Sequence, residues 1–189
     1  MQQNNVDFIG FQTEEEIDSP LHKDNPYAFK IYCFLRAMQL GYDTIIYADS
    51  SLYPVRSLQP IVEHIKENGY IMEDSGFYAG DWCNQNALDY FGTRKDLIKD
   101  VPMFSAGFLG LDMTNNTSKM FFNGWKNAML QGAFKGSWAD HRHDMTCASI
   151  IAKCHFDMDY VPLFTYLAYI GSGHQTPKET AVFHLKPTI

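Results

Sequence analysis

The chain has 189 residues, of which 46% are hydrophobic and 20% are charged, and these values are typical of one folded domain with its own core. Its 15 basic and 22 acidic residues give a net charge of −7, which argues against a broad surface for nucleic acid or anionic membrane. The opening MQQNNVDF lacks the pattern of a signal peptide, and no transmembrane run of roughly 18 apolar residues occurs, so we expect a single soluble, cytoplasmic domain over 1–189.

In the first half of the chain, predicted strands alternate with predicted helices. Strands are expected at 6–11, at 44–47 and at 70–72. One helix is expected from Pro26, capped by Asn25 and ended by Gly41, and a second between Ser57 and Gly69.

The second half is expected to hold four helices and three strands. The helices are predicted at 84–91, 93–99, 119–130 and 140–155, and the strands at 103–111, 163–170 and 181–185. The early alternation is typical of an α/β layer with a largely parallel sheet. In such sheets, ligands bind beyond the carboxyl ends of the strands.

The stretch TIIYADSS places an acidic residue and two hydroxyls at the end of an apolar strand. Asp49, Ser50 and Ser51 could hold a divalent cation and substrate phosphates, or accept ribose hydroxyls. The same residue types are also favoured in turns and helix caps. The local pattern leaves both interpretations open.

Two further segments carry candidate ligand contacts. Lys30 lies one turn into the first predicted helix, where the helix dipole favours an anion, although a lysine there can also be a solvated charge. In the segment FHLKP, His184 could ligate a metal and Lys186 could contact a phosphate, or the histidine could be structural. The strand segment SAGFLG has glycines that indicate close approach of a ligand or another backbone.

The densest ionisable cluster is DHRHD at 140–144. On a helix, His141 and Asp144 would share one face, and so would Asp140 and Asp144. That face could supply a metal ligand, a general base or contacts to sugar hydroxyls. The alternative is a charged helix N-terminus capped by Asp140.

The four cysteines are Cys33, Cys83, Cys147 and Cys154, and they lack the close spacing of a metal knuckle. We expect free thiols in a reducing compartment. Aromatic residues make up 15% of the chain, which suits either a large core or a platform for sugar rings or bases.

Taken together, NPYAFK, GYDTIIYADSS, SAGFLGLD and DHRHDMTCASIIAKC resemble nucleotide-diphospho-sugar transferases of the GT-A fold over roughly residues 6–155. More narrowly, they are similar to small glycosyltransferase domains of chlorella viruses, which act in capsid glycan synthesis. The resemblance implies an α/β, Rossmann-like domain with a mixed, mostly parallel sheet flanked by helices. It also implies transfer of a sugar from a nucleotide-diphospho-sugar, a UDP-sugar by preference, to a glycan or glycoprotein acceptor, in the host cytoplasm if the protein is viral.

The resemblance further implies a role for each candidate residue. Asp49 and His184 would ligate Mn²⁺ or Mg²⁺, with Mn²⁺ favoured, although Ser51 stands where a second carboxylate would be expected. The remaining donor contacts would be Lys30, Ser50, Ser51, Ala106, Gly107 and Lys186. Asp144 and His143 would be catalytic, and Asp140 and His141 would lie on the acceptor side.

Two other functions fit the same residues. The first is a non-catalytic domain that binds a sugar nucleotide or glycan through a degenerate metal motif. The second is a metal hydrolase with His141, His143 and Asp144 as ligands.

Overall fold

Two small sheets organise the part of the chain that the computed structural model describes, residues 9–169 and 183–185. The strands are β1 (Thr44–Ala48), β2 (Leu52–Pro54), β3 (Tyr70–Tyr78), β4 (Pro102–Asp112), β5 (Leu167–Tyr169) and β6 (Phe183–Leu185). The α-helices are α1 (Ala28–Gln39), α2 (Gln59–Asn68), α3 (Gln85–Phe91), α4 (Asn116–Leu130) and α5 (His143–Ile150). Short 3-10 turns cover Glu14–Ile17, Ala79–Asp81 and Lys95–Leu97, and a π-helical turn over Ile151–His155 continues α5.

The central sheet has the order β1-β4-β3, and the second sheet has the order β2-β6-β5. β4 pairs antiparallel with both β1 and β3, whereas β5 and β6 pair in parallel. The mixed α/β class is confirmed, but the expectation of a mostly parallel sheet is wrong. β1 and β3 do run in the same direction, as the strand–helix alternation predicts, but β4 inserts between them in the opposite direction.

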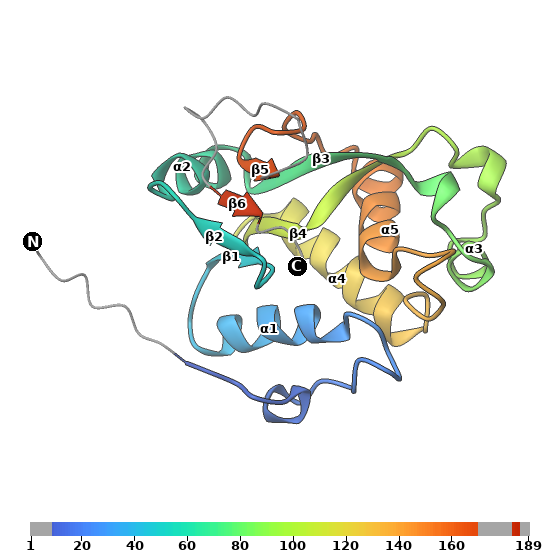
Figure 1. The fold of residues 1–189 in the computed structure, drawn as a ribbon, viewed down its shortest axis with the longest axis horizontal. Helices are drawn as coiled ribbons and strands as arrows, with labels where there is room; N and C mark the ends of the chain where they lie inside the picture. Colours follow the sequence, from blue (N-terminus) through green and yellow to red (C-terminus); the bar gives the residue numbers. More distant parts are fainter. Residues whose placement is uncertain (1–8, 170–182, 186–189) are drawn as a thin grey trace, which may run out of the picture.

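Side chains of the central sheet alternate between two hydrophobic clusters. Met72, Leu109 and Leu111 join the larger cluster, which also contains the buried sides of α1, α4 and α5. Ile71 and Phe108 join a smaller cluster with residues of α2, β2 and β5. The sheet is therefore covered on both faces, with α1, α4 and α5 on one side and α2 with the second sheet on the other (Figure 1).

Local signals set several element ends as predicted. The side chain of Asn84 accepts a hydrogen bond from the Ala87 amide and caps α3. Gly69 adopts a φ of 86° and ends α2. A side chain at Gly110 would overlap Ile65 and Ile71, so this glycine lets α2 pack closely on β4.

Other predicted elements are corrected by the structure. Residues 9–11 are outside any strand, and residues 6–8 lie outside the described residues. The expected helix at 93–99 is only the 3-10 turn Lys95–Leu97, and the strand predicted at 163–170 is confined to Leu167–Tyr169. Asn25 does not cap α1, because its side-chain amide donates instead to the Met129 carbonyl.

Candidate functional site

Asp49 follows β1 directly, where the chain turns into β2. Its amide donates to the Gly107 carbonyl at 2.9 Å, and its carbonyl accepts from the Leu52 amide at 2.8 Å. These bonds hold the turn that contains Ser50 and Ser51 against β4. The Asp49 side chain is 40% exposed, so this carboxylate is available to a ligand, and both serines are exposed beside it.

Gly107 makes room for that carboxylate. A Cβ atom at Gly107 would lie 2.7 Å from Asp49 Oδ2, closer than van der Waals contact permits. The glycines of the SAGFLG strand were predicted to admit a ligand or another backbone, and at Gly107 the structure instead shows the Asp49 side chain in close approach. Asp49 and Gly107 form one unit across β1 and β4.

Behind Asp49 lies a buried ion pair between Lys30 of α1 and Asp144 of α5. Lys30 Nζ is 2.9 Å from Asp144 Oδ2 and 3.8 Å from Asp49 Oδ1, and it donates to the Ala106 carbonyl at 2.9 Å. Lys30 and Asp144 are each 3% exposed. Burial raises the pKa of Asp144, and the neighbouring Lys30 charge opposes that rise.

Two tyrosines enclose this ion pair. The rings of Tyr27 and Tyr47 each have their centroid 5.1 Å from Lys30 Nζ, a range in which the π face attracts a cation. The Tyr47 hydroxyl donates to Asp49 Oδ1 at 2.6 Å. Burial, followed by the Asp49 charge, raises the pKa of Tyr47, so the phenol stays protonated and orients the carboxylate.

The DHRHD segment does not form one helical face, which corrects the prediction of a helix over 140–155. α5 begins only at His143, and the preceding residues form a turn in which the His141 amide donates to Ser137. Asp140 is exposed on that turn, whereas Asp144 is buried. The shared faces expected for His141 with Asp144 and for Asp140 with Asp144 are therefore absent.

His141 and His143 are both buried against backbone carbonyls. His141 places Nδ1 3.1 Å from the Trp82 carbonyl and Nε2 2.9 Å from the Ala133 carbonyl. His143 places Nδ1 2.8 Å from the Phe134 carbonyl, and its backbone has a φ of 44°. Burial lowers the pKa of His141. His141 thus ties the turn to two other segments, and neither ring nitrogen of His141 is open to an acceptor in this conformation.

Among the described residues, no three His, Cys, Asp or Glu side chains converge to hold a metal. This contradicts the hydrolase interpretation, in which His141, His143 and Asp144 would share one ion. For His184 the structure describes the backbone, which pairs with Tyr53 of β2 and so lies on the strand next to the one that leaves the Asp49 turn. Lys186 lies outside the described residues.

Sequence reasoning missed Tyr47 and Tyr27. Tyr47 could have been found, because strand residues two apart point to the same side and Tyr47 precedes Asp49 by two. Tyr27 has a φ of 60° and lies just before α1, and no local pattern indicates that its ring covers Lys30. The buried Glu73 was also missed, and it accepts hydrogen bonds from the amides of Phe164, Tyr166 and Leu167.

The chain has the fold of a glycosyltransferase, which confirms the GT-A class predicted from the sequence. It is similar to the apo structure of the bifunctional glycosyltransferase WbbM, with a TM-score of 0.50 and 12% identity over 89% of this chain and 33% of that chain. The apo structure of mouse xyloside xylosyltransferase 1 is also similar, with a TM-score of 0.45 and 13% identity over 77% of this chain and 55% of that chain. Our chain thus spans about a third of the WbbM chain, and at this identity the likeness extends to the fold alone.

No protein-family model and no curated protein sequence matches the chain. Within the part of the chain that the structure describes, no helix is long and apolar enough to cross a membrane.

Proposed function

We propose that this chain is a glycosyltransferase that moves a sugar from a nucleotide-diphospho-sugar, a UDP-sugar by preference, to a glycan or glycoprotein acceptor. The observation that carries the proposal is the half-exposed Asp49 carboxylate at the end of β1, seated against the bare backbone of Gly107. The glycosyltransferase fold supports it. The narrower likeness to chlorella virus domains and a cytoplasmic location stay predictions.

Asp49 would bind Mn²⁺ or Mg²⁺ together with the donor. Its exposed carboxylate oxygen and the hydroxyls of Ser50 and Ser51 are ligands that suit such hard cations. Asp49 supplies the carboxylate at this turn, and the described residues form no cluster of three His, Cys, Asp or Glu side chains, so diphosphate oxygens, and His184 by proposal, would complete the shell. When bound, the ion would neutralise charge on the departing diphosphate.

The chain's own residues would hold and orient the reactants. Tyr47 fixes the Asp49 carboxylate. Lys30 compensates the negative charge of both Asp49 and Asp144 from inside the protein, so it acts on the donor through these carboxylates rather than by direct contact with a phosphate. Ala106 and Gly107 would line the donor sugar with backbone atoms.

Asp144 and His143 are the proposed catalytic residues. Asp144 would orient or deprotonate the acceptor hydroxyl, and its raised pKa suits a general base. Since both side chains are at most 3% exposed, this role requires a rearrangement when substrates bind. Asp140, which is exposed, remains the proposed acceptor-side contact from this segment.

A second candidate is a domain that binds a sugar nucleotide without transferring the sugar. The presence of Ser51 in place of a second carboxylate favours this alternative. The two candidates predict the same binding and differ in turnover. Release of free nucleotide diphosphate from the donor, with or without an acceptor, distinguishes them.

Calorimetric titration with UDP-, GDP- and CMP-sugars, with and without Mn²⁺, tests the proposal. We expect one sugar nucleotide to bind wild type more tightly with Mn²⁺, and Asp49→Ala to abolish the Mn²⁺ effect. Asp100→Ala is the matched control, because the Asp100 side chain is 85% exposed and its ion-pair partner is Lys99 rather than a residue of the site. Absence of binding to wild type would refute the function, whereas unchanged binding by Asp49→Ala would refute the placement of the site.

A further inference from the structure

A row of aromatic side chains extends outward from the Lys30–Asp144 pair. It consists of Tyr27, Trp138, Trp82 and Phe77, and we call it the aromatic strip. The Tyr27 and Trp138 ring centroids are 5.9 Å apart, and those of Trp82 and Phe77 are 6.2 Å apart. The strip begins at the site itself, because the Tyr27 ring lies 5.1 Å from Lys30 Nζ.

Arg142 joins the two halves of the strip. Its guanidinium carbon lies 3.5 Å from the Trp82 ring centroid and 4.2 Å from that of Trp138, and its Nη1 donates to the Trp138 carbonyl. The Thr146 hydroxyl adds a hydrogen bond to the Trp82 carbonyl. Residues from two separate segments are therefore fixed together, so a ligand would meet a pre-organised surface at low entropic cost.

Phe77 and Trp138 of the strip are open to solvent, whereas Tyr27 and Trp82 are partly buried and Trp82 also packs against the larger hydrophobic cluster. Trp138 is 55% and Phe77 is 50% exposed, whereas Trp125 is completely buried in the core. Contiguous exposed rings on a folded protein indicate a binding surface. The three tryptophans thus differ: Trp125 is buried in the core, Trp82 is partly buried against it, and Trp138 faces the solvent.

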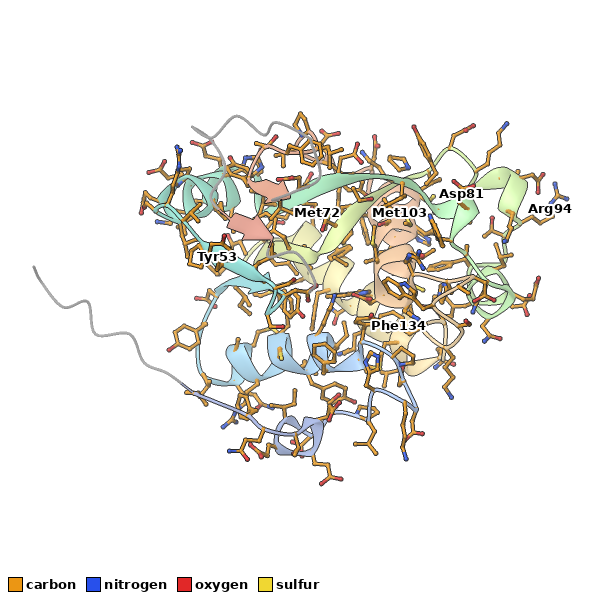
Figure 2. All side chains as sticks on the ribbon, in the orientation of Figure 1. Tyr53, Met72, Asp81, Arg94, Met103 and Phe134 are labelled. Carbon is orange, nitrogen blue, oxygen red and sulfur yellow. The ribbon has the colours of Figure 1, made fainter. Side chains whose placement is uncertain are left out.

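Two exposed carboxylates are close in sequence to the tryptophans of the strip. Asp81 precedes Trp82, Asp140 follows Trp138 by two residues, and both are exposed. Figure 2 shows Asp81 beyond the end of β3, on the opposite side of the view from Tyr53 of β2. Rings with separated carboxylates suit a carbohydrate, because its C–H faces stack on rings and its hydroxyls donate to carboxylates. They do not suit a nucleic acid, whose phosphates these carboxylates would repel.

We propose that the aromatic strip binds a neutral oligosaccharide as the acceptor and directs its end toward Asp49 and Asp144. The orientation toward transfer rests on the proposed function, whereas the binding of the oligosaccharide does not. Continuity of the strip with the site, through Tyr27 and Lys30, is what selects an acceptor over an unrelated ligand. A peptide that binds the strip is the competing outcome of the test.

Intrinsic tryptophan fluorescence provides the measurement, since Trp82 and Trp138 are two of the three tryptophans. The full chain is titrated, without donor, with hexasaccharides of the malto, cello, xylo and chito series. We expect at least one to change the emission, and Phe77→Ala and Trp138→Ala to weaken its binding roughly tenfold, about 1.4 kcal/mol. For Trp138→Ala, binding is measured by calorimetry, because this variant lacks one of the tryptophans that report binding by fluorescence. Trp138→Tyr should retain most of the affinity, and Tyr42→Ala, which removes a ring 51% exposed and outside the strip, should retain all of it.

A titration with the sugar nucleotide, followed by a transfer assay that measures the acceptor KM, separates the two proposals. If wild type binds a sugar nucleotide and transfers its sugar while Trp138→Ala leaves the acceptor KM unchanged, the strip proposal is wrong and the proposed function stands. If wild type binds no sugar nucleotide but binds a hexasaccharide through the strip, the proposed function fails alone. An unchanged emission with every hexasaccharide, or a change caused only by peptides, overturns the strip proposal.

Discussion

Gly107 is the residue at which the smallest change should have the most specific effect. In Gly107→Ala the added methyl would lie 2.7 Å from Asp49 Oδ2, so the carboxylate must shift from the position in which Tyr47 holds it. We expect a modest loss of stability and a large loss of the Mn²⁺-dependent donor affinity, measured by calorimetry.

The coupling to Asp49 can be isolated with a double-mutant cycle. In an Asp49→Ala background the added methyl meets no carboxylate, so Gly107→Ala should cost much less stability there. Equal costs in both backgrounds would show that the glycine matters for another reason.

Lys30 provides the second test at this scale. Lys30→Met leaves the Asp144 carboxylate buried without its cation, which typically costs about 3–5 kcal/mol. Urea denaturation should detect this loss, and Lys30→Met combined with Asp144→Leu should recover much of it, because no uncompensated charge remains. A double variant as unstable as the single one would contradict the assignment of the pair.

Local sequence could not predict the burial of Lys30. Its partners, Asp144 and the Ala106 carbonyl, come from segments far along the chain, and a lysine one turn into a helix is usually solvated. Asp49, by contrast, was predictable, because its position depends on a strand that ends where the apolar residues end.

Among the elements, the connection from Glu73 of β3 to β5 is expected to respond to pH. Burial raises the pKa of Glu73 from 4.5 to about 7. Hydrogen bonds from three backbone amides lower this pKa by less, and the neighbouring Asp74 charge raises it slightly. Because the folded-state pKa lies above the unfolded one, the stabilising contribution is complete below about pH 4.5 and is lost as pH rises through about 7.

Thermal unfolding of wild type and Glu73→Gln between pH 4 and pH 9 provides the measurement. The difference in Tm, wild type minus variant, should decrease across this window, since the glutamine does not titrate. The variant should also be less stable at low pH, because its NH₂ group would face amide donors near Phe164 and Tyr166. A Tm difference that increases with pH would contradict this sign.

The ends of helices were predicted correctly where the signal is local. They were predicted wrongly where a contact with a distant segment determines the end. Asn84 and Gly69 mark the ends of their helices through their own side chain or backbone. The start of α5 at His143 instead coincides with the buried His141, whose ring nitrogens lie 3.1 Å from the Trp82 carbonyl and 2.9 Å from the Ala133 carbonyl, both outside the helix. A helical spacing pattern cannot contain that information.

For the whole molecule, the fold class was predictable and the strand direction was not. Alternating strands and helices indicated the α/β class, and β1 and β3 do run in the same direction. The insertion of β4 between them depends on long-range pairing, with Ile46 and Ile71 both opposite Gly110. That arrangement brings Gly107 beside Asp49, so the site itself is a consequence of the antiparallel pairing.

The two hydrophobic clusters predict that the molecule opens unevenly. Among the residues that the structure describes, the cluster under α2, β2 and β5 contains six buried ones, whereas the cluster that joins α1, α4 and α5 is far larger and includes Trp125. Regions with less buried apolar surface open at lower free energy. Amides of α2 should therefore exchange with deuterium faster than those of α4.

Ile61→Ala and Phe121→Ala separate the two clusters, since both side chains are completely buried, one in each. Ile61→Ala should accelerate exchange in α2 and leave α4 protected. Phe121→Ala should instead lower the free energy of global unfolding, and so accelerate exchange in both helices. If α2 keeps its protection in Ile61→Ala, the two sides unfold as one unit. Should the expected pattern hold, β2 belongs to the side that opens first, because Leu52 is part of the smaller cluster, and this gives the segment after the Asp49 turn the freedom to close around a substrate.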